Sequence, residues 1–123
     1  MTSVRKPLGN IKVLDLTHML SGPYGSMILA DLGCEVVKIE PPKKGEGTRR
    51  LLENDPDYSV NGMGAYFYTL NRNKKSVAID LKKDQGLKVF YKLVEKADVV
   101  TVSYTHLRAH ETRGNLVCRL LLE

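Results

Sequence analysis

A polar turn at residues 17–21 follows the first apolar run of the chain, at residues 11–16. It places the Thr17 hydroxyl, the His18 imidazole and the Ser21 hydroxyl between that run and an apolar helical pattern that ends at Gly33. Such groups can hydrogen-bond a ligand, although a lone turn histidine more often has a structural role. Ligands of parallel sheets collect beyond the carboxyl ends of the strands, beside helix N-termini. The sequence therefore predicts the functional site near residues 17–21.

The remaining histidines and the cysteines do not form a recognisable metal site. His106 and His110 are four residues apart and would make half of a metal site on a helix, but no third ligand accompanies them. We therefore expect no metal. Cys34 and Cys118 have the spacing of neither a disulfide framework nor a zinc site. A reduced, cytoplasmic setting fits these two thiols best.

The elements that position the polar turn are a strand, a helix and a second strand. Residues 11–16 are almost continuously apolar, as expected of a strand covered on both faces. Ser21 is an N-cap candidate and Pro23 falls in the first helical turn, where its missing N–H costs nothing. Gly33 ends the helix, and a second strand at residues 34–40 stops at two prolines. A β-α-β order with short joints predicts an α/β fold with a parallel sheet.

The rest of the chain continues this alternation after a long loop. Residues 43–57 lack periodicity and are predicted to form a loop with a helical turn near residues 49–53. A short helix is expected at residues 64–70 and a third strand at residues 76–81. Leu87, Phe90 and Val94 recur at helical spacing in a helix that opens at residues 82–85, and a fourth strand follows at residues 99–101.

The charge of the chain favours an anionic partner. The 123 residues include 19 Lys and Arg against 14 Asp and Glu, a net charge of +5. The basic residues gather at residues 43–44, 49–50, 72–75 and 82–83. A phosphorylated small molecule is the simplest partner of this kind, and solvated surface lysines are the alternative for any one cluster. No apolar run reaches membrane-spanning length and the first ten residues lack a signal core, so we expect no membrane partner.

Two other function classes fit the sequence less well. A dinucleotide-binding oxidoreductase would carry a G-x-G-x-x-G turn after the first strand, and residues 21–26 read SGPYGS instead. A small basic nucleic-acid-binding module would need an aromatic platform or a helix-turn-helix pattern beside its basic clusters. Neither pattern is present in the sequence, so we expect no nucleic-acid partner.

The character of the sequence changes at about residue 102. Residues 103–115 have no clean periodicity, and residues 116–123 are an apolar run broken by Arg119. The string from Ser103 to Leu122 also resembles the translation of a sequencing-adaptor segment, and such segments are excluded from fold reasoning. We therefore expect residues 1–101 to form part of a domain and residues 102–123 to be a non-native tail.

Residues 7–101 resemble the N-terminus of the family III CoA-transferases, a family that includes the α-methylacyl-CoA racemases. The segments that carry the resemblance are LGNIKVLDLTH (8–18), SGP (21–23), ADLGCEVVKIEPP (30–42) and LNRNKKSVAIDLK (70–82). The resemblance implies a Rossmann-like, CoA-binding parallel sheet that is the N-terminal portion of a CoA-transferase large domain. It also implies an interlocked homodimer for the full-length parent. Transfer of CoA and racemisation both stay open.

The resemblance also implies which residues line the CoA site. These are His18, Leu20 and Ser21 in the first turn, and Ile79, Asp80, Leu81 and Lys82 at the third strand. Lys82 suits the charged part of CoA because a lysine is a mobile point charge. Pro41 occupies a position where the family often carries a basic residue, so no phosphate contact is expected there. Coenzyme A is implied as a substrate, with no tightly bound cofactor.

The mechanism implied by the resemblance uses an aspartate nucleophile that this chain does not match. In the family that aspartate takes the acyl group from CoA as a mixed anhydride and passes it on through an enzyme–CoA thioester, which divides one difficult exchange into easier ones. None of Asp15, Asp31, Asp80 and Asp98 corresponds to it. We therefore expect a chain that holds part of the CoA site and no catalytic residue.

Overall fold

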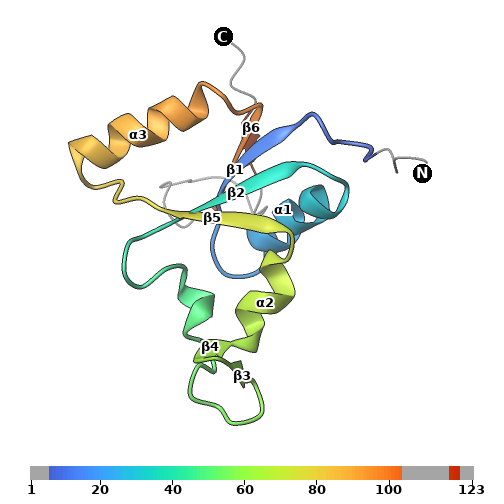
Figure 1. The fold of residues 1–123 in the computed structure, drawn as a ribbon, viewed down its shortest axis with the longest axis vertical. Helices are drawn as coiled ribbons and strands as arrows, with labels where there is room; N and C mark the ends of the chain where they lie inside the picture. The colour runs from blue at the N-terminus through green and yellow to red at the C-terminus, as the bar shows by residue number, and fades with distance from the viewer. Residues whose placement is uncertain (1–5, 104–116, 120–123) are drawn as a thin grey trace.

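The computed structural model describes residues 6–103 and 117–119 (Figure 1). In chain order its elements are β1 (Lys12–Leu16), α1 (Ser21–Asp31), β2 (Glu35–Glu40), the short 3₁₀-helix η1 (Gly47–Arg49), β3 (Ser59–Val60), β4 (Met63–Gly64), α2 (Ala65–Asn71), β5 (Lys74–Ala78), α3 (Asp84–Val94), β6 (Val99–Val102) and β7 (Val117–Arg119).

One mixed sheet organises the chain. Strands β5, β2, β1 and β6 lie side by side in that order and are all parallel, and β7 pairs antiparallel with β6. The predicted α/β fold with a parallel sheet is confirmed. Because parallel strands all point the same way, the carboxyl ends of β1, β2, β5 and β6 meet at one edge of the sheet.

Side chains that alternate along β1 divide the core into two layers. Val13 packs with Ala30, Cys34 and Val36 on the face that α1 covers. Leu14 packs on the other face, together with Ile39 and Ile79 and the apolar side of α3. Both faces of the strand are therefore buried, which accounts for its nearly continuous apolar run. The same alternation places Asp15 on the α1 face.

The ends of α1 are close to the predicted ones, but Ser21 is not the N-cap. Leu20 occupies that position and no side chain caps the helix. The reason is that the Tyr24 N–H already donates to the Leu20 carbonyl at 2.9 Å, so the helix begins one residue earlier than expected. Pro23 lies in the first turn as predicted. Gly33 follows the helix with φ of +107°, the left-handed conformation that glycine adopts most easily.

The third strand was predicted two residues too late. β5 spans Lys74–Ala78, not residues 76–81, and among the described strands it pairs only with β2. Its ladder ends where Glu40 meets Ala78, because Pro41 has no N–H to donate. After a last bond from the Ile79 N–H to the Glu40 carbonyl, at 2.9 Å, the chain leaves the sheet. Residues 80–82 are therefore free to form a turn.

A small lobe formed by η1, β3, β4 and α2 projects below the sheet in Figure 1. The helical turn expected at residues 49–53 is not there: the 3₁₀-helix η1 ends at Arg49, where that turn was expected to begin, and residues 50–54 form a non-helical turn. The helix α2 begins one residue later than expected. The β3–β4 hairpin was not predicted, because two strands of two residues each leave almost no alternation to detect.

The predicted boundary at residue 101 stays a prediction. β6 continues to Val102, one residue further than expected, and β7 lies beyond it. His106 and His110 lie outside the described residues. In the described part of the chain no helix is long and apolar enough to cross a membrane, and no group of three His, Cys, Asp or Glu residues could hold a metal ion.

Candidate functional site

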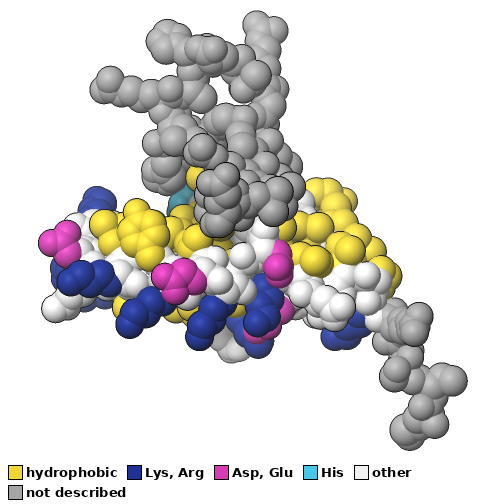
Figure 2. All heavy atoms as spheres, turned by 90° about the horizontal axis from the view of Figure 1, so that it is seen from above, with side chains coloured by type: hydrophobic (Ala, Val, Ile, Leu, Met, Phe, Trp, Pro, Cys, Tyr) yellow, Lys and Arg dark blue, Asp and Glu magenta, His cyan; other side chains and the backbone are white. Residues whose placement is uncertain are grey.

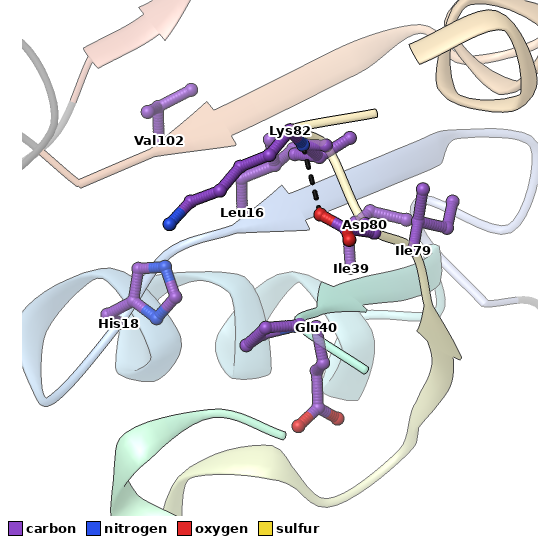
Figure 3. Close-up of a pocket in the computed structure, with 10 residues that line it drawn as sticks. Leu16, His18, Ile39, Glu40, Ile79, Asp80, Lys82 and Val102 are labelled. Carbon is purple, nitrogen blue, oxygen red and sulfur yellow. Dashed lines mark hydrogen bonds between the residues drawn. The ribbon is translucent and has the colours of Figure 1, made fainter. Parts of the chain in front are cut away.

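A cavity of about 380 Å³ opens at the carboxyl edge of the sheet (Figure 3). Four strand ends contribute to its wall. Its lining residues are Leu16 and His18 after β1, Ile39, Glu40 and Pro41 at the end of β2, Ile79, Asp80, Leu81 and Lys82 after β5, and Val102 of β6. Most of this surface is aliphatic, with a few polar groups at its margin. Such a cavity suits a ligand with a long, weakly polar part and a charged part.

The structure brings together five of the seven predicted site residues. His18, Ile79, Asp80, Leu81 and Lys82 line the one cavity, and Figure 3 shows the His18 ring and the Lys82 ammonium group turned toward the same space. These residues come from segments more than 60 positions apart in the sequence. The parallel register of β1, β2 and β5 places them side by side.

The other two predicted residues, Leu20 and Ser21, are outside the cavity wall. Leu20 is about half exposed, at 55% of its accessible surface, and Ser21 is the first residue of α1. Both belong to the turn that carries His18. Leu16, Ile39, Glu40 and Val102 line the cavity but were not predicted, although their place at the carboxyl ends of predicted strands was a usable signal.

The turn that carries His18 is held from two sides by side chains distant in sequence. The Ser103 hydroxyl accepts a hydrogen bond from the His18 N–H at 2.9 Å. The buried Glu46 carboxylate accepts one from the Met19 N–H at 3.1 Å and another from the Thr48 hydroxyl. Met19 has φ of +66°, a conformation that side chains other than glycine adopt rarely. These bonds therefore fix an unusual backbone shape and with it the place of His18.

The opposite side of the cavity is a turn closed by Asp80. Its Oδ1 atom accepts a hydrogen bond from the Lys82 N–H at 3.1 Å, drawn as the dashed line in Figure 3. The Asp80 carbonyl accepts another from the Lys83 N–H at 3.2 Å. α3 begins directly after this turn, and Gly86 in its first turn lies against the Asp80 backbone.

Gly86→Ala is expected to disturb both the fold and the cavity. An added Cβ would lie 1.9 Å from the Asp80 carbonyl oxygen, so α3 or the turn must move. Overpacking of this kind typically costs about 1–3 kcal/mol, and we expect the free energy of unfolding, measured in urea, to fall by that amount. Gly47→Ala is the matched control, because its Cβ would meet no atom within 4 Å. Equal stability of the two variants would contradict this contact.

Glu40, which lines the cavity at the end of β2, forms an ion pair with Arg49. The guanidinium donates from Nε to Oε2 and from Nη2 to Oε1, both at 2.7 Å. The Ser76 hydroxyl and the Glu46 N–H also donate to the Glu40 carboxylate, at 2.6 and 2.7 Å. Burial acts to raise the pKa of Glu40, but these donors outweigh it and lower the pKa to about 2. The Arg49 guanidinium also stacks on the Phe67 ring at 3.8 Å.

A second charged cluster lies beneath the His18 turn and was missed by the sequence analysis. The fully buried Asp15 carboxylate contacts Lys74 Nζ at 2.9 Å and Lys38 Nζ at 3.7 Å, and both ammonium groups are buried too. Lys38 Nζ also donates to the Thr17 carbonyl at 2.8 Å. Ser26 Oγ donates to Asp15 at 2.6 Å. The cluster thereby anchors the end of β1 from which the turn starts.

The cluster shifts the pKa values of Asp15 and Lys74. Burial opposes ionisation of Asp15, but the two lysines and the hydroxyls of Ser26 and Thr17 outweigh it, so the pKa of Asp15 falls below its ordinary value. Burial lowers the pKa of Lys74, and Asp15 offsets only part of that effect. A signal was available in the sequence, because Asp15 and Lys38 are charged residues inside strands predicted to be buried.

Three comparisons with known proteins agree with one another. Residues 8–112 match the description "CoA-transferase family III". A succinyl-CoA:glutarate CoA-transferase of Homo sapiens is 41% identical over 99 residues, which are 80% of this chain and 22% of that protein. A formyl-CoA:oxalate CoA-transferase of Escherichia coli O6:H1 is 40% identical over 98 residues, 80% of this chain and 23% of that protein.

The fold has a solved counterpart as well. A CAIB/BAIF family protein from Brucella suis superposes with a TM-score of 0.71 at 37% sequence identity, over 79% of this chain and 25% of that one. The chain therefore spans about a quarter of the length of the relatives that it matches.

Proposed function

The chain belongs to CoA-transferase family III, and from that premise we propose that the cavity at the carboxyl edge of the sheet binds coenzyme A. The observation that carries the proposal is the meeting of His18 with residues 79–82 in one cavity, since these are the segments that the resemblance assigns to the CoA site. Leu20 and Ser21 directly follow the turn that carries His18, at the start of α1.

The chemistry of the cavity matches the parts of CoA. The aliphatic wall of Leu16, Ile39, Ile79 and Val102 suits the pantetheine arm, which is a chain of methylene and amide groups. Lys82 is exposed at the margin, where its ammonium group can approach a phosphate without losing its hydration first. The His18 ring faces the same space as the Lys82 ammonium group and can hydrogen-bond an amide of the arm.

The proposed activity of the full-length protein is the transfer of CoA between two carboxylic acids. An aspartate carboxylate attacks the thioester carbonyl and expels the CoA thiolate, which leaves a mixed anhydride. The thiolate then attacks the aspartyl carbonyl, which releases the first acid and leaves an enzyme–CoA thioester for the second. We propose that this aspartate lies outside the present chain and that two interlocked subunits complete the site. The relatives reported above are CoA-transferases, which favours transfer over racemisation.

Calorimetric titration of the chain with CoA tests the proposal. We expect saturable binding to one site, and we expect Lys82→Gln to weaken it about tenfold, which is about 1.4 kcal/mol for the loss of one charge-assisted phosphate contact. Lys92→Gln is the matched control, because Lys92 is an exposed lysine of α3 that does not line the cavity.

Two results would contradict the proposal. One is the absence of saturable binding at low salt. The other is an equal loss of CoA affinity in the two lysine variants. A general loss of positive charge weakens the binding of any anion, whether or not the lysine contacts it.

A further inference from the structure

Glu46 is a buried carboxylate that connects the ends of two neighbouring strands, β1 and β2. Only 1% of its surface is exposed, whereas many acidic and basic side chains lie on the surface of the face drawn in Figure 2. The Glu46 N–H donates to the Glu40 carboxylate, at the end of β2, at 2.7 Å. The Glu46 carboxylate accepts from the Met19 N–H, beyond the end of β1, at 3.1 Å, and from the Thr48 hydroxyl. Glu46 therefore joins the end of β2 to the turn that carries His18.

Both ends of this turn are fixed without Glu46. At its start the Thr17 N–H donates to Asp15 Oδ1 at 2.9 Å. At its end Gly22 packs so closely that a Cβ there would lie 2.4 Å from Thr17 Cβ. The stretch between these two anchors, residues 18–21, is where the loss of a hydrogen bond can change the course of the backbone.

Within this stretch, Met19 has the conformation that needs support. Its φ of +66° lies in the left-handed region, which is unfavourable for a residue with a Cβ. Its side chain is half exposed, so side-chain burial compensates little for this backbone. The hydrogen bond to Glu46 acts on the Met19 N–H itself, whereas the Ser103 hydroxyl bonds to the backbone of His18. Loss of the bond to Glu46 would therefore favour another φ at Met19 and redirect the peptide that follows His18.

We propose that Glu46 is a positioning residue for CoA binding: its carboxylate holds Met19 in the left-handed conformation, which directs the His18 ring into the cavity (Figure 3). The inference rests on the proposed function, because it takes His18 as a contact of CoA. It adds a residue that does not line the cavity. A turn already held in its binding conformation loses little further freedom when the ligand binds, and such preorganisation raises affinity.

Calorimetric titration of two variants at position 46 with CoA tests whether the acceptor oxygen is what matters. Glu46→Gln keeps an oxygen for the Met19 N–H and is expected to bind CoA about as tightly as the unaltered chain. Glu46→Leu has no acceptor and is expected to bind CoA about tenfold more weakly, which is about 1.4 kcal/mol and typical of one lost hydrogen bond. Both variants remove the same negative charge, so Glu46→Gln is the matched control for the electrostatic change.

Substitutions at position 19 separate this mechanism from a general effect on the fold. Glycine adopts positive φ readily, so adding Met19→Gly to Glu46→Leu is expected to restore most of the lost affinity. Met19→Val alone is expected to weaken CoA binding with Glu46 in place, because a β-branched residue is a rare outlier at positive φ. The Met19 side chain is half exposed, so neither change opens the core. The comparison of Met19→Gly with Met19→Val therefore carries the test if urea titration shows that Glu46→Leu is unfolded.

Three results would overturn the inference and leave the proposed function standing. The first is equal CoA affinity of Glu46→Gln and Glu46→Leu. The second is a failure of Met19→Gly to restore binding to a folded Glu46→Leu chain, and the third is equal affinity of Met19→Gly and Met19→Val. The absence of saturable CoA binding by the unaltered chain would overturn the inference and the proposed function together.

Discussion

Asp15→Ala is expected to lower the free energy of unfolding by about 3–5 kcal/mol, the range typical of removing one partner from a buried ion pair. The carboxylate is fully buried between the ammonium groups of Lys38 and Lys74, which are buried as well. Its removal would leave two cations in the interior without a counter-charge. Folded domains are stable by only about 5–15 kcal/mol, so urea titration at neutral pH should show a markedly lower transition midpoint for the variant.

The control for this prediction is Asp31→Ala. Asp31 pairs with Arg72 at 2.6 Å, but both side chains are substantially exposed, so its removal should have only a small fraction of the effect. The difference in the free energy of unfolding between Asp15→Ala and the unaltered chain should also become smaller as the pH rises toward 10.5, the ordinary pKa of lysine. The reason is that neutral amines are less costly to bury than ammonium groups. Equal losses in the two aspartate variants would show that the buried cluster does not stabilise the fold.

The second large effect is a loss of stability in acid that depends on Glu40. Its pKa is about 2 in the folded chain against an ordinary value of 4.5. A depressed carboxylate pKa adds stability above pH 4.5, and that stability is lost as the pH falls toward 2. The difference of about 2.5 units corresponds to about 3 kcal/mol. Urea titrations at pH 6 and pH 2.5 should therefore show a fall in the free energy of unfolding that is smaller in Glu40→Gln.

Glu35→Gln is the matched control for the acid effect. Glu35 also has a lowered pKa, chiefly from a hydrogen bond with Lys75, but the pair is exposed and solvent screens it. Its replacement should leave most of the acid sensitivity in place. If Glu40→Gln keeps the full pH dependence of the unaltered chain, the ion pair with Arg49 is not its source.

Local sequence signals were enough to predict most of the fold. The apolar run before residue 17, the glycine at position 33 and the two prolines after Glu40 correctly bounded β1, α1 and β2. Each of these signals acts through the backbone of its own segment. The order of strands and helices then limited the chain to an α/β fold, because parallel strands require a crossover between them.

The errors concern the ends of two elements, β5 and α1. β5 ends at Ala78 because β2, its sole neighbour among the described strands, ends at Glu40, before Pro41, and nothing within residues 74–81 indicates this. Ser21 failed as an N-cap because the Leu20 carbonyl accepts the first helical hydrogen bond. Both outcomes depend on backbone hydrogen bonds at the end of an element, and hydrophobic periodicity does not report those bonds.

Residues that line the cavity could be predicted from the sequence, but the residues that hold the His18 turn in place could not. His18 and Lys82 were found through the resemblance, and the sheet register brings them to one cavity. Glu46 and Ser103, which hold the His18 turn, were not found, because a single Glu or Ser in a loop has no pattern. Val102 and Ser103 even fall in the stretch that the sequence analysis assigned to a non-native tail.

The buried charges also limit which substitutions the chain can accept during evolution. Within the described part of the protein, the carboxylates of Asp15 and Glu40 each have cationic partners in other strands or loops. Replacement of one partner leaves an unpaired ion in the interior. A chain with one substitution is therefore less stable, even where a chain with both partners replaced would fold. These positions should therefore covary among descendants, whereas the exposed partners Asp31 and Arg72 are free to drift one at a time.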